Sequence, residues 1–175
     1  LCILSGLYGL LRPFDTMQPY RLEMGTRLDV DGGKNLYQFW AKHGLTSRLA
    51  ALAKANGANT VVNCASQEYA KAVNFKELRE QYGLNVVDIT FKSKSGRMAA
   101  VFAKQARGMM VRYVVKSGAE TPEQLQGFTG ADGRFKFNAA QSSDTNFIFE
   151  RHENPQGPGD EAVFGIPAAT GASRG

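Results

Sequence analysis

The chain has 175 residues, of which 43% are hydrophobic and 21% are charged, and its formal net charge is +5 at pH 7. This balance is typical of a globular protein and excludes an intrinsically disordered one. No hydrophobic run approaches the roughly 18 residues that a membrane span needs, so we expect no membrane partner. The basic balance allows binding to nucleic acid, because neutralised phosphates release counterions, but it does not require it.

The first 25 residues, LCILSGLYGLLRPFDTMQPYRLEMG, join an apolar run to a turn-rich segment. Residues 1–4 have the size and composition of a buried strand. The segment that follows is dense in glycine, proline, charged and aromatic residues, and such a loop at the end of a strand is a common place for a functional site. The open alternative is an ordinary connection whose arginines pair with Asp15 and Glu23.

Periodicity predicts two principal helices. The first spans 36–56, with Asn35 as its N-cap and an interruption at Gly44. The second spans 104–117, and the pattern of the preceding residues fits either a strand or the start of this helix. Shorter helices are predicted at 66–69, 75–82 and 121–126, and strands at 60–65, 85–92, 134–138 and 146–150.

These elements predict an α+β (mixed α/β) fold in a single domain, with a central mixed sheet flanked by helices and a C-terminal β-hairpin. We expect this domain over residues 1–151 and a disordered tail over 152–175, which is rich in Gly, Pro and Ala. Because the chain begins with leucine, we expect that an N-terminal portion of the domain is missing.

The cysteines and histidines predict neither a redox pair nor a metal site. Cys2 and Cys64 lie in apolar runs and are expected to be buried. The sequence has no CxxC motif, which favours a reducing cytoplasmic location. His43 and His152 have no carboxylate at a metal-binding spacing. No P-loop, dinucleotide fingerprint or GxSxG motif is present, so no cofactor is expected.

Clustered cations are the first candidate site, because Lys and Arg bind phosphate oxygens. The predicted DNA-binding residues are Arg12, Arg21, Lys104, Arg107 and Arg112. The backbone amides of Gly6 and Gly9 are candidate phosphate donors, since G-x-x-G turns bind nucleic-acid backbones in some modules. A merely solvated helix face is the alternative interpretation of the helical cations.

An enzyme pocket is the second candidate. Glu23 or Glu68 would act as a general base, Arg21 or Arg107 would hold an anionic substrate, and Asn63 would orient it. The alternative here is a structural network in which Arg21 pairs with Glu68. A cleft lined by Lys and Arg would favour DNA, whereas an enclosed pocket with convergent Glu, Arg and Asn would favour a small substrate.

Five co-linear blocks carry a resemblance to a known family. They are SGLYGLLRP with QPYRLEMG, then NLYQFW, NCASQEY, KQARGMMVRY and QLQGF. In this order they resemble the YaaA family of bacterial peroxide-stress proteins. The resemblance extends from residue 1 to about 151.

The resemblance implies a cytoplasmic stress protein that binds DNA through a helix-hairpin-helix-like element in a positively charged cleft. It also implies an association with low free intracellular iron. Family members have a further N-terminal portion with a Ser-Pro-Ala-Lys motif, which is absent here. We therefore expect a monomer that binds double-stranded DNA, largely independently of sequence, and limits iron-driven oxidative damage. Binding rather than catalysis is the expected activity.

Overall fold

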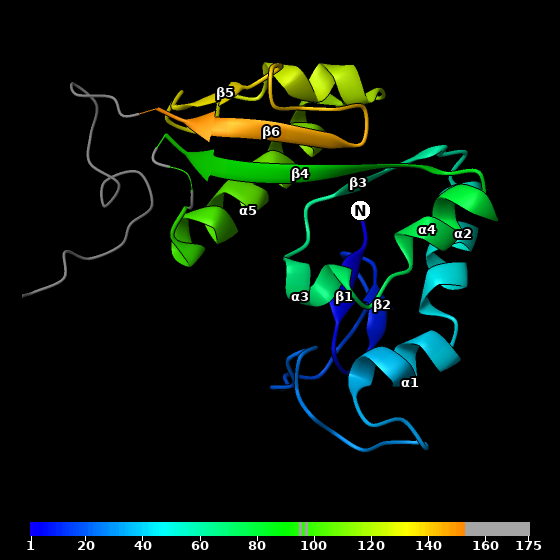
Figure 1. The fold of residues 1–175 in the computed structure, drawn as a ribbon. Coiled ribbons are helices and arrows are strands. Elements are labelled where there is room, and N and C mark those ends of the chain that lie inside the picture. Colours follow the sequence, from blue (N-terminus) through cyan, green and yellow to red (C-terminus); the bar gives the residue numbers. More distant parts are fainter. Residues whose placement is uncertain (95, 97, 153–175) are drawn as a thin grey trace, which may run out of the picture.

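The computed structural model describes residues 1–94, 96 and 98–152 (Figure 1). The tail expected beyond residue 152 lies outside the described residues. The elements are, in chain order, β1 (Ile3–Ser5), β2 (Gly9–Leu11), α1 (Leu36–Lys42), α2 (Leu45–Ala55), β3 (Thr60–Asn63), α3 (Gln67–Ala70), α4 (Phe75–Glu80), β4 (Asn85–Ser93), α5 (Ala100–Ser117), the 3-10 helix η1 (Pro122–Gly127), β5 (Phe135–Phe137) and β6 (Asn146–Arg151).

The main sheet has four strands in the order β3-β4-β6-β5. β4 is parallel to β3 and to β6, whereas β5 is antiparallel to β6. The predicted α+β fold with a mixed sheet and a C-terminal hairpin is therefore confirmed. Because successive side chains of a strand point to opposite faces, Val86 and Val87 of β4 lie on opposite faces of the sheet.

Each side chain of this pair belongs to a different hydrophobic cluster. Val87 packs with Met110 of α5 and with the phenylalanines of the hairpin. Val86 packs in the other cluster with Leu78 of α4 and with the helices that precede β3. Figure 1 shows α5 along the sheet, and α1, α2 and α4 gathered at the other end of the molecule.

The first predicted long helix consists of two shorter helices, α1 and α2. Asn35 caps α1 as expected, because its Oδ1 accepts the N–H of Gln38 at 3.0 Å. The helix predicted over 36–56 is broken at the predicted interruption, since Gly44 adopts a left-handed conformation with φ of 68° and separates α1 from α2. The pattern of the residues before 104 fitted either a strand or the start of the second helix, and they are helical from Ala100 onward.

The N-terminal strand also differs from its prediction. β1 pairs with β2 in a separate two-stranded antiparallel sheet, where Ser5 lies opposite Gly9. Leu1 is 66% exposed, Ile3 is 47% exposed, and Cys2 is exposed. The expected burial is therefore wrong for Leu1, Cys2 and Ile3, because this strand lies in a two-stranded hairpin outside the main sheet, whereas Leu4 is half-buried against the core cluster. No helix among the described residues is long and apolar enough to cross a membrane.

Candidate functional site

The SGLYG turn is clamped from two sides. The indole Nε1 of Trp40 donates a hydrogen bond of 3.0 Å to the carbonyl of Gly6. A Cβ on Gly9 would lie 2.6 Å from the same ring, and a Cβ on Gly6 would overlap the carbonyl oxygen of Leu22. Both glycines are buried. Their identities therefore follow from close packing, and their predicted contact with phosphate stays a prediction.

A hydroxyl cluster lies beside this turn. Ser5 is 2% exposed, and its Oγ is hydrogen-bonded to the hydroxyl of Tyr20. The same Oγ accepts the backbone N–H of Tyr8 at 3.0 Å. The rings of Tyr8 and Tyr20 meet edge to face, with centroids 5.5 Å apart. The loop after β2 is thereby tied back to the hairpin.

Glu68 connects the QPYRLEMG segment to α3. Its Oε1 accepts the backbone N–H of Gly25 at 2.8 Å, and its carbonyl accepts the hydroxyl of Tyr37 at 3.0 Å. Burial, followed by the charge of Glu68, raises the pKa of the neighbouring Tyr69. Segments 20–25, 35–40 and 66–69 thus meet around the hairpin, and we call this group of contacts the N-terminal junction.

The two arginines predicted on the loop have local carboxylate partners. The guanidinium of Arg12 lies 2.8 Å from Asp15, and this hydrogen-bonded pair holds the pKa of Asp15 below its usual value. Arg21 has a side chain that is 92% exposed, with its Nε 3.7 Å from Glu23. The pairing considered between Arg21 and Glu68 is wrong, because Glu68 accepts from Gly25 instead.

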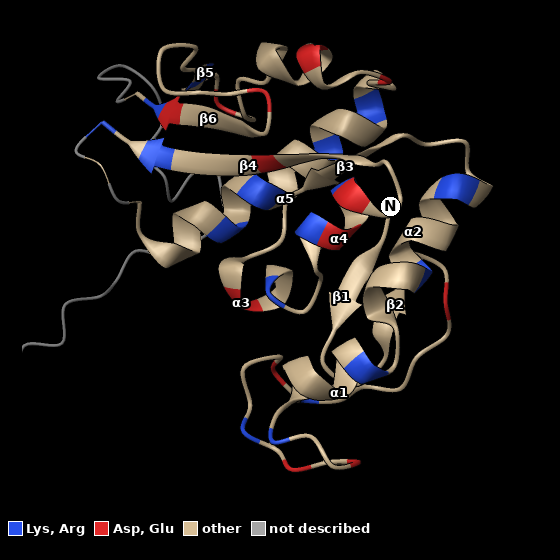
Figure 2. Cartoon of the chain, turned by 45° about the vertical axis from the view of Figure 1, so that its right-hand side comes forward, with Lys and Arg blue, Asp and Glu red and all other residues tan. Residues whose placement is uncertain are grey.

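The three cations predicted on the second helix all lie on α5, where Figure 2 shows bands of Lys and Arg. Lys104 and Arg112 are exposed, and Arg107 is half-buried. Burial raises the pKa of the Cys64 thiol to about 11, and the positive charge of the nearby Arg107 acts in the opposite direction. The structure therefore brings Lys104, Arg107 and Arg112 together on one helix and leaves Arg12 and Arg21 on the N-terminal loop.

The residues of the predicted enzyme pocket do not share one hydrogen-bonded group in the described part of the chain. Asn63 donates to Asp88 across the β3–β4 pair at 2.7 Å, and its Oδ1 accepts the N–H of Ala65. Glu23 lies near Arg21, whereas Glu68 contacts Gly25. Asn63 thus finishes a strand, and Glu68 fixes a loop.

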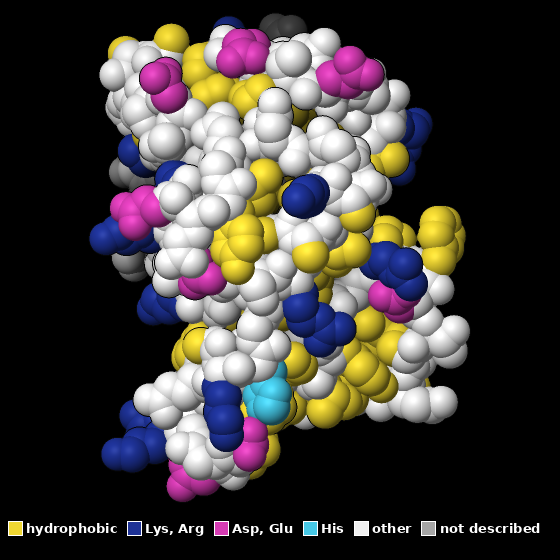
Figure 3. Space-filling model, turned by 90° about the vertical axis from the view of Figure 1, so that its right-hand side faces the viewer, with side chains coloured by type: hydrophobic (Ala, Val, Ile, Leu, Met, Phe, Trp, Pro, Cys, Tyr) yellow, Lys and Arg dark blue, Asp and Glu magenta, His cyan; other side chains and the backbone are white. Residues whose placement is uncertain are grey.

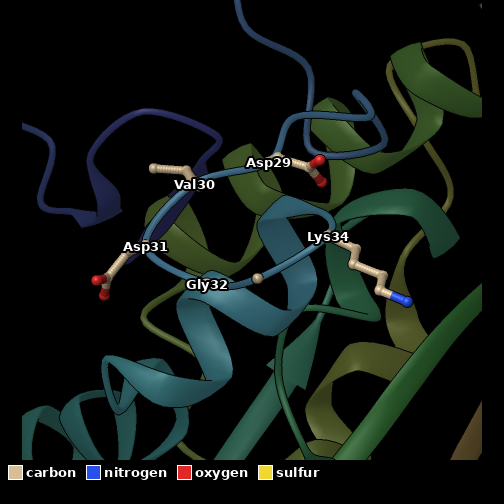
Figure 4. Close-up of a pocket in the computed structure, with 6 residues that line it drawn as sticks. Asp29, Val30, Asp31, Gly32 and Lys34 are labelled. Carbon is tan, nitrogen blue, oxygen red and sulfur yellow. The ribbon is translucent and has the colours of Figure 1, made fainter.

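One shallow pocket of about 320 Å³ is formed by the turn before α1, residues 29–34. In Figure 4 the side chain of Asp31 points to the opposite side of the turn from that of Lys34. Asp31 instead receives hydrogen bonds from Lys42 at 3.0 Å and from His43 at 2.9 Å. Within the described residues, no group of three or more His, Cys, Asp or Glu side chains is placed to hold a metal ion.

Several junction residues were not among the candidates. Trp40 is one of them, and its indole donates to the SGLYG turn. The Ser5–Tyr20 pair joins residues 15 positions apart through an irregular loop, for which the sequence carries no periodic signal.

A comparison with known protein families matches residues 1–141 of this chain to the family described as peroxide stress protein YaaA. The match includes every segment of the N-terminal junction and the whole of α5. It extends over more than half of the chain, and a peroxide stress family supports a role in the response to oxidative stress. The chain therefore belongs to the YaaA family of peroxide stress proteins.

Proposed function

We propose that this chain acts in the peroxide stress response by binding double-stranded DNA, largely independently of sequence, and so limiting iron-driven oxidative damage. The observation that supports this proposal is the charge of α5. The helix has 18 residues with four cations and no carboxylate. Within the described residues, the side chains of Lys104, Arg107 and Arg112 form no ion pair or hydrogen bond. Their charges are thus available to an external anion.

The length of the cationic helix suits a duplex. Lys104 and Lys116 are twelve positions apart, which corresponds to about 18 Å along the helix axis. B-DNA carries one negative charge per about 1.7 Å of its axis, so about ten phosphates lie along such a length. Contacts of this kind are made to the backbone and carry no sequence information, which agrees with binding that is independent of sequence.

Arg107 is the cation that a solvated helix face explains least well. It is half-buried beside Cys64, a thiol that stays protonated at neutral pH and offers no negative charge. Among the described residues its guanidinium has no carboxylate partner, so its charge is left for an external anion. Binding a phosphate would supply the missing anion.

The binding test compares the wild-type chain with a variant carrying Lys104→Gln, Arg107→Gln and Arg112→Gln on a labelled duplex. We expect affinity to fall by roughly one order of magnitude or more at low salt, because several phosphate contacts are lost. Lys76→Gln is the matched control, since Lys76 is an exposed cation of α4 that faces Glu80 at 3.8 Å. Equal affinities for the wild-type and triple variant chains would overturn the assignment to α5.

The protective role is tested with supercoiled plasmid exposed to ferrous iron and hydrogen peroxide. We expect the wild-type chain to slow nicking and the triple α5 variant to lose this effect in proportion to its lost affinity. Equal protection by both proteins would separate protection from DNA binding and contradict the proposal.

A further inference from the structure

The side chain of Met109 joins α5 to the loop that follows η1. Its sulfur accepts a hydrogen bond of 3.3 Å from the backbone N–H of Ala131. A thioether sulfur is only a weak acceptor. Among the described residues, Met109 is the one methionine whose sulfur accepts a hydrogen bond. This sulfur therefore makes a contact that an apolar side chain of the same size could not make.

The loop bonded to this sulfur has a defined shape. Its ends meet where the N–H of Phe135 donates to the carbonyl of Thr129 at 2.9 Å. Within it, the Nε of Arg134 lies 3.2 Å from the Oδ2 of Asp132, and these side chains are only 9% and 4% exposed. We call residues 129–134 the sulfur-bound loop. A change at the sulfur would thus act on an ordered segment.

The sulfur of Met109 is within reach of a small oxidant. The five methionines of the chain differ widely in exposure. Met17 is 45% exposed, whereas Met24 and Met110 are 0% exposed. Met109 is half-buried, and its hydrogen bond to Ala131 lies at the surface. Because oxidation of a methionine requires access to its sulfur, Met109 is open to oxidation and its neighbour in the sequence is not.

Exposure alone does not single out a methionine. Hydrophobic side chains reach the surface at several places on the face that Figure 3 shows. Met17 is such an exposed residue, and among the described residues its sulfur has no hydrogen bond for oxidation to break. Met109 combines access with a contact that depends on the chemical state of its sulfur.

We propose that Met109 is a site of reversible oxidation by hydrogen peroxide, and that its oxidation releases the sulfur-bound loop from α5. A lone pair of the sulfur attacks one peroxide oxygen, the O–O bond breaks, and the other oxygen leaves as water with both protons. The sulfur is oxidised by two electrons to the sulfoxide, and the peroxide is reduced. The sulfoxide sulfur carries a partial positive charge, so it no longer accepts the N–H of Ala131.

The family match supplies the oxidant for this step. A peroxide stress family supports a role for the chain under conditions in which hydrogen peroxide is present. Methionine sulfoxide is reduced again by dedicated reductases, so the change is reversible. The inference does not depend on DNA binding, because oxidation of Met109 alters no charge of α5 and its test uses no DNA.

The hydrogen bond also predicts which sulfoxide forms. One lone pair of the Met109 sulfur is directed at the N–H of Ala131, so peroxide reaches the other. We expect one sulfoxide epimer in excess at Met109, whereas the exposed Met17 should give both in comparable amounts. Two classes of reductase each reduce one epimer, so a single class should remove most of the Met109 sulfoxide and about half of that at Met17.

The experiment treats the whole folded chain with hydrogen peroxide. Mass spectrometry of its peptides measures oxidation at each methionine, and NMR measures hydrogen exchange at the Ala131 amide. We expect Met17 and Met109 to be oxidised while Met24 and Met110 stay intact. Exchange at Ala131 should accelerate roughly two- to fivefold, the effect of losing one weak hydrogen bond. Treatment with both reductases should restore the slow exchange.

Two variants assign the effect to one sulfur. Met17→Leu removes the exposed methionine and should keep the full response of the Ala131 amide to peroxide. Met109→Leu conserves the apolar volume but removes the acceptor, so exchange at Ala131 should be fast before treatment and unchanged by it. If Met109→Leu does not fold, the wild type and Met17→Leu still decide the question.

Three results would overturn the inference. One is an intact Met109 in the folded chain under conditions that oxidise Met17. Another is oxidation of Met109 without faster exchange at Ala131. The third is an acceleration by peroxide in Met109→Leu equal to that in the wild type. Equal amounts of both epimers at Met109 would contradict the protection of one lone pair by the hydrogen bond.

Discussion

The indole of Trp40 lies directly against the backbone of Gly9, so that a Cβ on Gly9 would come within 2.6 Å of the ring. The same indole donates to the carbonyl of Gly6, and its side chain belongs to the core cluster at α1, α2 and α4. One buried ring thus joins the N-terminal hairpin to the helices. The hairpin, which has only two strands, depends on this contact for its position.

Replacing Gly9 by alanine should therefore destabilise the chain. The φ of Gly9 is +72°, which an alanine adopts at a cost of about 1–2 kcal/mol, and the clash with Trp40 adds about 1–3 kcal/mol of overpacking. We expect the free energy of unfolding to fall by roughly 2–5 kcal/mol in urea denaturation. Gly83→Ala is the matched control, because Gly83 has a φ of +65° and no atom within 4 Å of its added Cβ. Equal losses in both variants would contradict the packing role of Trp40.

Removal of the Glu68 carboxylate should loosen the QPYRLEMG segment. Glu68→Ala deletes the acceptor of the Gly25 N–H, and since this bond is exposed we expect a cost of about 1 kcal/mol. Hydrogen exchange at the Gly25 amide should accelerate by about fivefold, which corresponds to that energy. Glu68→Gln keeps an oxygen acceptor at the same place and should exchange nearly as slowly as the wild type. Rapid exchange in the glutamine variant would show that charge matters more than the hydrogen bond.

Cys64 should be unreactive at neutral pH. Burial raises its pKa to about 11, so about one thiol in a thousand is ionised at pH 8. In a Cys2→Ser variant, alkylation of Cys64 by iodoacetamide should be far slower than alkylation of the exposed Cys2 in a Cys64→Ser variant. Comparable rates in the two variants would contradict the burial of Cys64.

The raised pKa also predicts a pH dependence of stability. The folded state holds the Cys64 proton more tightly than the unfolded state, whose thiol pKa is near 9.0. The resulting stabilisation is complete below pH 9 and is lost as the pH rises towards 11. In urea titrations, the free energy of unfolding of the wild type should therefore fall relative to that of Cys64→Ser as the pH rises from 9 to 11. A wild-type stability that does not fall relative to Cys64→Ser would contradict this assignment.

Most of the fold follows from local patterns in the sequence. The β5–β6 hairpin, the N-cap at Asn35 and the helix of residues 104–117 each have a periodic or capping signal that involves neighbouring residues. The incorrect prediction of burial for the apolar run at residues 1–4 has a different cause. An apolar run of this length shows that a strand is favoured, but the number of strands beside it is a tertiary property, and β1 has one neighbour.

The candidate site was harder to predict for the same reason. The cations of α5 lie on one helix, so their grouping follows from sequence spacing alone. The contacts of Glu68 with Gly25 and of Trp40 with Gly6 join residues 43 and 34 positions apart through irregular segments. Glycine in SGLYG is compatible with a phosphate-binding turn and with close packing, and the position of the indole is visible only in the folded chain.

The salt dependence of duplex DNA binding tests the central claim most directly. The logarithm of the binding constant, plotted against the logarithm of salt concentration, has a slope of about −0.9 per neutralised phosphate. We expect a steep slope for the wild-type chain and a slope reduced by about one unit in Arg107→Ala, with affinity lowered to a similar extent on unrelated duplex sequences. Absence of binding at low salt, or an unchanged slope in Arg107→Ala, would contradict a phosphate contact on α5.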